Sequence, residues 1–137
     1  MMDGDKAVVA VIDVIKALTL PDFDGDAVHK YDPPEEVSGE YIAVDHLPFV
    51  FDSPLENGIV NINVHVPRLT NGRIPSARLY ALWHPIKEVF EESDEQPYGK
   101  YLDGAYFLSR SHSRPTLDGD NTYYVNIQLT VTFNNLK

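Results

Sequence analysis

The strongest constraint on the fold is a long alternation of apolar and polar residues near the end of the sequence, from Tyr123 to Phe133. Successive side chains of a β-strand point to opposite faces, so this pattern predicts a strand with one buried face and one polar face. The expected inward residues are Tyr123, Val125, Ile127, Leu129, Val131 and Phe133. At about 1.5–3 kcal/mol for each buried side chain, this strand is predicted to contribute strongly to the core.

The same alternation predicts a second strand from Ile59 to Val66. The expected inward residues are Val60, Ile62, Val64 and Val66, and the expected outward residues are Asn61, Asn63 and His65. The pair Asn57-Gly58 comes directly before this strand, and such a pair adopts positive φ easily. We therefore expect a turn at Asn57-Gly58.

The first helix is predicted from Lys6 to Leu18. Its apolar residues recur at helical spacing, and they are Val8, Val11, Ile12, Ile15 and Leu18. Asp13 and Lys16 fall on the opposite side, as in an amphipathic helix. Pro21 bars a longer helix because proline lacks a backbone donor and clashes with the preceding turn.

The second helix is predicted to begin after Ser76, whose hydroxyl is the expected N-cap. Its apolar positions are Leu79, Leu82, Trp83, Ile86, Val89 and Phe90. Pro85 lies inside this segment and costs about 3 kcal/mol in a continuous helix. We expect a kink or a break between Trp83 and Ile86, with two shorter helices as the alternative.

Shorter segments complete the expected fold. A short strand is predicted within Val28 to Tyr31, a weakly alternating one within Glu40 to Val44, and another within Leu102 to Ser109. Leu47 to Phe51 contains Pro48 and is expected to be an edge strand or irregular. Arg110 to Asn121 is polar and is expected to be a hairpin or a loop.

This order of elements indicates an α+β protein with a mainly antiparallel sheet of about four to five strands and two helices packed on one face. A chain of 137 residues fits a single domain, so we expect one domain over residues 1–137.

Charge and composition narrow the classes of function. Asp and Glu number 21 against 11 Lys and Arg, which gives a formal charge of −10 that repels nucleic acid and anionic lipid. We therefore expect no specific nucleic-acid binding. No apolar run approaches the ~20 residues that cross a bilayer, so we expect no membrane contact and a cytoplasmic location. The absence of cysteine removes thiolate chemistry and Cys-based metal sites.

No motif predicts catalysis or a cofactor. The five histidines are His29, His46, His65, His84 and His112, and no two have the spacing of metal ligands on one helix. Asp22 to Asp26 lacks the spacing of a calcium loop, and Ser109, Ser111 and Ser113 lack the sharp turn of a nucleophilic serine. We expect no enzyme and no cofactor. A small enzyme built from Asp45, His46 and His65 remains an alternative, which bound transition metal would favour.

The polar faces of the two long strands are the candidate interaction surface. Tyr124 stands out there, because an exposed aromatic side chain often marks a protein interface. The candidate interface residues are Tyr124, Asn126, Gln128, Thr130, Asn61 and Asn63.

Four stretches of the chain resemble the tail-terminator, or tail-completion, proteins of long-tailed bacteriophages. They are the helix AVVAVIDVIKAL, the strand GIVNINVHVPR, the helix ARLYALWHPIKEVFEE and the closing strand YYVNIQLTVTF. The resemblance covers most of the chain and lies in element order and pattern; Asp22 to Pro34 and Pro85 depart from its simplest form.

The resemblance implies a structural subunit without catalysis that forms a ring, expected to be a hexamer, at the head-proximal end of the tail tube. Its partners would be itself, the tail tube and the head-connector proteins. It would occupy the host cytoplasm during assembly and then the virion tail, and DNA could pass through the ring. The alternative is a non-catalytic domain of a bacterial system that binds a protein or a glycan through Tyr124 and the polar sheet face.

Overall fold

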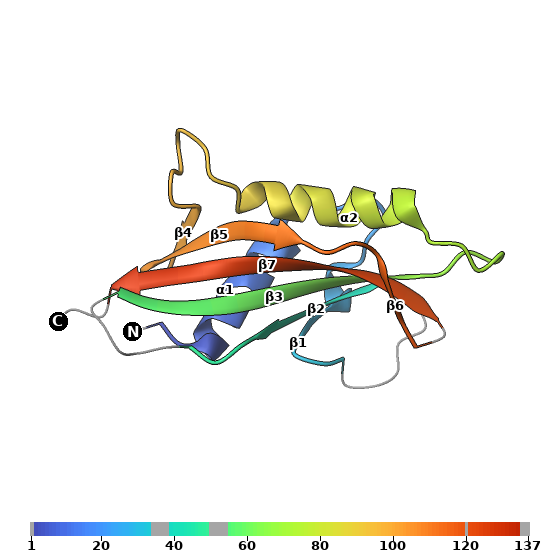
Figure 1. Ribbon diagram of the computed structural model, residues 1–137, viewed down its shortest axis with the longest axis horizontal. Helices are drawn as coiled ribbons and strands as arrows, with labels where there is room; N and C mark the ends of the chain where they lie inside the picture. The colour runs from blue at the N-terminus through green and yellow to red at the C-terminus, as the bar shows by residue number, and fades with distance from the viewer. Residues whose placement is uncertain (1, 34–38, 50–54, 120, 135–137) are drawn as a thin grey trace.

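The computed structural model describes residues 2–33, 39–49, 55–119 and 121–134. They form an α+β fold with two α-helices and a curled, mixed sheet (Figure 1). The elements in chain order are α1 (Gly4–Ala17), the 3-10 helix η1 (Gly25–Ala27), β1 (Val28–Lys30), β2 (Tyr41–His46), β3 (Leu55–Pro67), α2 (Ser76–Val89), β4 (Lys100–Leu102), β5 (Ala105–His112), β6 (Thr116–Asp118) and β7 (Thr122–Asn134).

The two long strands predicted from alternation lie side by side at the centre of the sheet. The strand order is β1-β2-β3-β7-β5-β4, with β6 also paired to β7. Across the antiparallel β3–β7 pair, Val60 faces Leu129 and Ile62 faces Ile127, and all four side chains are fully buried. The expected faces of both strands are therefore confirmed, except that Tyr123 is only partly buried.

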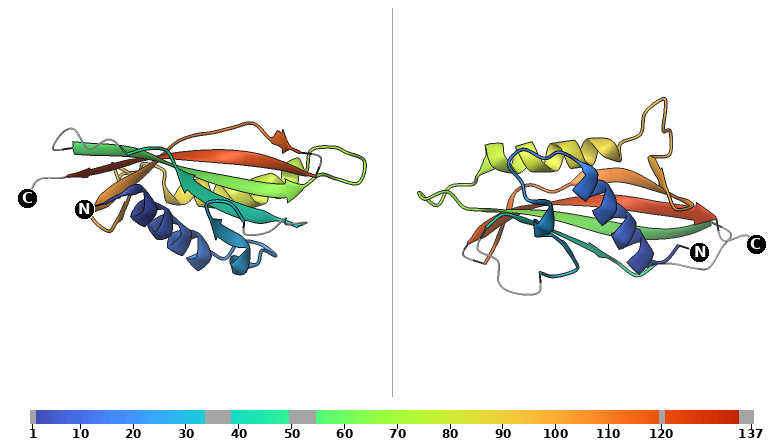
Figure 2. Two further views of the ribbon diagram at one scale, coloured as in Figure 1. Left: turned by 90° about the horizontal axis from the view of Figure 1, so that it is seen from below. Right: turned by 180° about the vertical axis from the view of Figure 1, so that it is seen from behind.

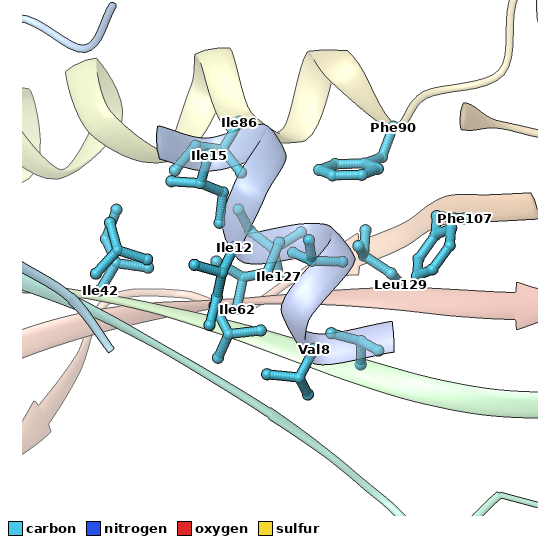
Figure 3. Close-up of a cluster of buried hydrophobic side chains, with 14 of the residues drawn as sticks. Val8, Ile12, Ile15, Ile42, Ile62, Ile86, Phe90, Phe107, Ile127 and Leu129 are labelled. Carbon is cyan, nitrogen blue, oxygen red and sulfur yellow. The ribbon is translucent and has the colours of Figure 1, made fainter. Parts of the chain in front are cut away.

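Both helices pack on the inward face of this sheet. α1 contacts β1 and β2, whereas α2 contacts β3 and β7. Figure 2 shows α1 on one side of the sheet, and Figure 3 shows Ile15 of α1 near Ile86 of α2, above Ile62 and Ile127. All these side chains belong to one cluster of buried residues. The two-helix arrangement on one face agrees with the sequence prediction.

The ends of the helices differ slightly from expectation. α1 starts at Gly4, because the Asp3 carboxylate accepts a hydrogen bond of 2.8 Å from the Lys6 amide and caps the helix earlier. Pro75 occupies the N-cap position of α2, so the predicted capping role of Ser76 is wrong.

Pro85 does not break α2. The helix continues as one element from Ser76 to Val89, so the alternative of two shorter helices is wrong. Proline leaves the Ala81 carbonyl without its usual donor, and both Ala81 and Pro85 are only half-buried. Water can reach this side of the helix, while Leu82 and Ile86 on the other side are fully buried. Core packing thus outweighs the local cost of proline.

The turn predicted at Asn57-Gly58 is absent, and a turn that was not predicted occurs at Asp103-Gly104. Asn57 and Gly58 form no turn, because they pair within β3 with Thr132 and Val131 of β7. Gly58 lies under the Phe49 ring, which would overlap with any Cβ at this position. Conversely, Asp103 and Gly104 both have positive φ and form the tight turn between β4 and β5. The strand predicted over Leu102 to Ser109 is therefore confirmed from Ala105 onward, as β5, but its first residue belongs to β4 on the other side of the turn.

On the edge of β7 that faces away from β3, the strands β5 and β6 follow one another along β7. β5 pairs with β7 up to His112, and β6 continues the same antiparallel edge. Between them, Ser113 donates its backbone N–H to the Asn126 carbonyl and accepts the Asn126 N–H on its hydroxyl, at 2.8 and 2.9 Å. The segment expected to be a hairpin or loop is thus partly strand. The sheet has seven strands in the described residues, with β1 parallel to β2.

Replacing Ile127 by alanine should lower the free energy of unfolding by about 2–5 kcal/mol, because it empties a fully buried position opposite Ile62. The neighbouring change Gln128→Ala, on the polar face, should cost far less. Urea unfolding of both variants measures the difference. Equal losses would contradict the assignment of the two faces.

Candidate interaction surface

The sheet face that points away from the helices carries the predicted interface residues. We call it the open sheet face; in Figure 1 it is the side of the sheet in front of α1. Asn61 pairs directly with Gln128, and Asn63 pairs with Asn126, across β3 and β7. The six predicted residues, Asn61, Asn63, Tyr124, Asn126, Gln128 and Thr130, are all half-buried. The structure therefore brings these six residues onto one surface.

A side-chain hydrogen-bond network links the centre of the open sheet face. The Asn126 amide nitrogen donates to the side-chain oxygens of Asn63, at 2.9 Å, and Asn61, at 3.3 Å. The Asn61 amide in turn donates to the Asp45 carboxylate at 3.0 Å. These bonds hold polar side chains of β2, β3 and β7 in fixed positions, which lowers the entropy lost when a partner binds.

Gln128 and Thr130 lie beside this network on β7. Their side chains make no hydrogen bond to another described residue. They therefore offer an amide and a hydroxyl to a partner or to water. A surface of this kind suits a wet protein contact, in which hydrogen bonds and bridging waters accompany modest apolar burial.

A row of stacked rings crosses one end of the open sheet face. The rings of Tyr41 and His65 lie 4.2 Å apart and nearly parallel, at 8°. The Tyr124 ring stacks on the other side of His65 at 5.2 Å. Cross-strand register places Tyr41, His65 and Tyr124 side by side on β2, β3 and β7. Much of Tyr124 is therefore used in packing within the chain; its use by a partner stays a prediction.

His65 is the one buried titratable residue on this face among the described residues, at 7% exposure. Its Nδ1 lies 3.4 Å from the Thr122 hydroxyl and 3.6 Å from the Asp118 carboxylate of β6. Burial lowers the pKa of His65 below its usual value, and the Asp118 carboxylate opposes this effect.

The structure does not assemble the alternative site suggested by Asp45, His46 and His65. His46 pairs with Val60, whereas His65 pairs with Tyr41 at the other end of the β2–β3 ladder. Asp45 binds Asn61, and the His46 ring lies near Gly4 and Phe49. Among the described residues, no group of three or more His, Cys, Asp or Glu side chains is placed to hold a metal ion.

The other segments tested for chemistry have structural roles. Asp24 caps η1 by accepting the Asp26 amide at 2.9 Å, and the Asp22 carbonyl accepts a bond from Arg78. His112 stacks on the Trp83 ring at 4.2 Å, and no hydrogen bond joins it to a described serine. Ser109 donates its backbone N–H to the Phe90 carbonyl, which ties the β5 bulge to the end of α2.

Two surface hollows were not predicted from the sequence. One holds about 590 Å³ beside β5 and β7 and is lined by Tyr98, Tyr106, Leu108, Arg110, Thr130 and Thr132, among others. The other holds about 410 Å³ between α2 and the β5–β6 connection. The tyrosines and the tryptophan were visible in the sequence, but their grouping depends on how β5 packs beside α2 and β7.

No protein-family model matches this sequence, and a comparison with curated proteins finds no matching relative. In the described part of the chain, neither helix has the length and apolar character needed to cross a bilayer.

The burial of His65 predicts how the stability of the fold depends on pH. Burial lowers the pKa of His65 in the folded state, so the folded protein binds this proton at a lower pH than the unfolded chain, in which a histidine has a pKa near 6.5. Stability should therefore fall as the pH drops below about 6.5, because protonation favours the unfolded chain. His65→Phe keeps a ring between Tyr41 and Tyr124 but removes the proton site. Urea unfolding at pH 7 and pH 5 should show a smaller pH effect in this variant than in the unmodified protein, and an unchanged effect would refute the assignment.

Proposed function

We propose that this protein is a structural subunit of a long-tailed bacteriophage or prophage, which forms a ring that terminates the tail tube and joins it to the head connector. The subunit is proposed to act without catalysis or cofactor. It would assemble in the host cytoplasm and end in the virion tail. The proposed ring is a hexamer, and its neighbours are the tail tube and head-connector proteins.

The order of elements supports this proposal. An N-terminal helix, a strand pair, a central helix and a long closing strand are the elements of the tail-terminator resemblance, and α1, β2–β3, α2 and β7 have that order. The inserted segment before β2 contains η1 and β1. β1 adds a strand, parallel to β2, at the edge of the sheet. Pro85 leaves the central helix intact.

The observation that carries the proposal is the open sheet face. Neither helix covers it, and its amide network presents ordered hydrogen-bonding groups over β2, β3 and β7. A subunit in a ring needs ordered surfaces that its own chain leaves available, either for a neighbouring subunit or for the channel. The formal charge of −10 fits a channel that DNA crosses without binding to its wall.

The assembly state tests the proposal directly. Light scattering over a concentration series, with electron micrographs of the same sample, should give discrete rings near the mass of about six subunits. A protein that remains monomeric at every concentration, and in the presence of purified tail tubes, would contradict it.

A substitution on the open sheet face should separate this surface from the rest. Gln128→Arg places a charge where no bond within the described chain is lost, so the fold should persist while ring formation weakens. The matched control is Thr19→Arg, which adds the same charge at an exposed position after α1. Light scattering should show that rings are lost in Gln128→Arg and retained in Thr19→Arg. Equal assembly of both variants would exclude the open sheet face as a contact.

One feature favours the alternative of a non-catalytic glycan- or protein-binding domain. The exposed rings of Tyr98 and Tyr106 stand 5.6 Å apart at the hollow beside β7, with Arg110 and two threonines nearby. Aromatic faces and hydrogen-bonding groups together suit a sugar or an extended peptide. A strictly monomeric protein that binds a glycan, and loses that binding in Tyr106→Ala, would favour this alternative.

A further inference from the structure

Charged residues are unevenly distributed along the chain. Residues 57–87 contain four Lys or Arg and no Asp or Glu, and residues 104–117 contain two Arg and no acid. These two segments meet where α2 packs beside the end of β5. The carboxylates that give the protein its charge of −10 lie elsewhere in the sequence.

The hollow of about 410 Å³ between α2 and the β5–β6 connection lies in this acid-free region. We call it the α2 hollow, and its lining includes Ser76, Tyr80, Trp83, His112, Arg114 and Pro115. Tyr80 is 52% exposed, and its ring meets Trp83 edge-on at 5.2 Å. Trp, Tyr and Arg are the side chains that most often dominate binding energy at protein contacts.

Two guanidinium groups at this end of α2 are available to a partner. Arg73 and Arg114 form no ion pair with a described residue. Arg78, in contrast, is already bound to the Glu40 carboxylate and to the Asp22 carbonyl. Arg114 therefore offers available positive charge beside the aromatic rings of the α2 hollow, and Arg73 precedes Ser76 by three residues in the chain.

The opposite end of α2 carries the complementary charge. Residues 91–95 contain four carboxylates, and we call this segment the acidic loop. Lys87 pairs with Glu91 at 2.8 Å, but Glu92, Asp94 and Glu95 are exposed and form no ion pair with a described residue. In Figure 1 the chain leaving this end of α2 projects beyond the sheet.

The acidic loop is held in a defined shape. The Gln96 side-chain amide donates to the carbonyls of Val89 and Glu91, at 2.9 and 2.7 Å, and so caps the end of α2. The backbone of Ser93 and Gln96 also forms two mutual hydrogen bonds. A loop fixed in this way loses little entropy when a partner binds its carboxylates.

Helix stability does not explain this distribution. The macrodipole of a helix favours acidic groups at the N-terminus and basic groups at the C-terminus. Lys87 in the last turn of α2 follows this rule, but the first turn has no acidic residue and the four carboxylates of the acidic loop come directly after the C-terminal end. The fourteen residues of α2 span about 21 Å, so the acidic loop, which follows the C-terminal end of this helix, lies far from Ser76, which lines the α2 hollow at the N-terminal end.

We propose that the acidic loop of one copy binds the α2 hollow of the next copy, with Glu92, Asp94 and Glu95 facing Arg73 and Arg114. Such a contact joins two different surfaces, and it generates a ring when the rotation between copies closes. The inference rests on the proposed ring-forming function, and it assigns a subunit contact separate from the open sheet face.

A cysteine pair tests the contact, since the natural chain has no cysteine. A disulfide requires Cα atoms within about 7 Å, so covalent oligomers formed by Asp94→Cys with Arg114→Cys would show that these two positions of different copies lie close together. Mild oxidation should give a ladder of covalent oligomers on a denaturing gel. The control pairs Asp94→Cys with Asp13→Cys, an exposed position on α1, and should give only traces from random collision. Equal ladders from both pairs would overturn the inference.

Charge reversal gives a second, independent test. Arg114→Glu should weaken assembly by at least about tenfold, because like charges would face each other. The fold should persist, since Ser113 and Thr116 donate hydrogen bonds to the backbone carbonyl of Arg114, which the substitution leaves in place. Adding Asp94→Arg and Glu95→Arg to the same chain should restore assembly. Normal assembly of Arg114→Glu, or no rescue, would overturn the contact.

Trp83 reports the contact directly, because it is the single tryptophan and lines the α2 hollow. Its emission should shift on assembly and stay unshifted in Arg114→Glu. If rings form without a ladder and without this shift, the inference is wrong while the proposed function stands. If no assembly occurs under any condition, both fail.

Discussion

The pairing of β3 with β7 is the interaction on which the rest of the structure depends. Both strands are thirteen residues long, and they pair along their whole length. Because side chains alternate, a slip of one residue would turn Ile62 or Ile127 to solvent and bury an asparagine. Hydrophobic burial therefore fixes the register, and the same register aligns Asn63 with Asn126 on the open sheet face. β2, β5 and β6 then add to the outer edges of this pair, and both helices cover its apolar side.

Sequence patterns predicted the elements in which a periodic pattern repeats over many residues. The alternation of β3 and β7 and the apolar stripes of α1 and α2 extend over many residues, so each pattern is distinctive. A short strand was expected where β1 lies, but β4 and β6, with three residues each, are too short to show a period, and the sheet was expected to have fewer strands for that reason. The parallel pairing of β1 with β2 depends on where the chain returns after α1, which no local pattern encodes.

The two Gly-containing pairs show that tertiary contacts decide whether a turn-forming pair of residues forms a turn. Asp103-Gly104 joins β4 to β5 with both residues at positive φ, as its sequence allows. Asn57-Gly58 has the same signal but stays in β3, where glycine makes room for the Phe49 ring. The candidate interaction surface was likewise predicted only in part. Its six polar positions follow from alternation, whereas the Asn126 network and the α2 hollow depend on which strands and helices become neighbours.

Self-association of so acidic a chain requires local charge complementarity. Copies that each carry a formal charge of −10 repel one another at long range, and salt reduces this repulsion over a distance of about 8–10 Å. The acid-free segments around α2 place Arg114, which forms no ion pair with a described residue, beside the aromatic rings of the α2 hollow, so attraction at short range can oppose the general repulsion. The open sheet face has few charges and contributes hydrogen bonds instead. Salt therefore acts in two directions: it relieves the repulsion between copies and weakens the contact between the acidic loop and the α2 hollow. Assembly that is strongest at intermediate ionic strength is the behaviour that this division of charge implies.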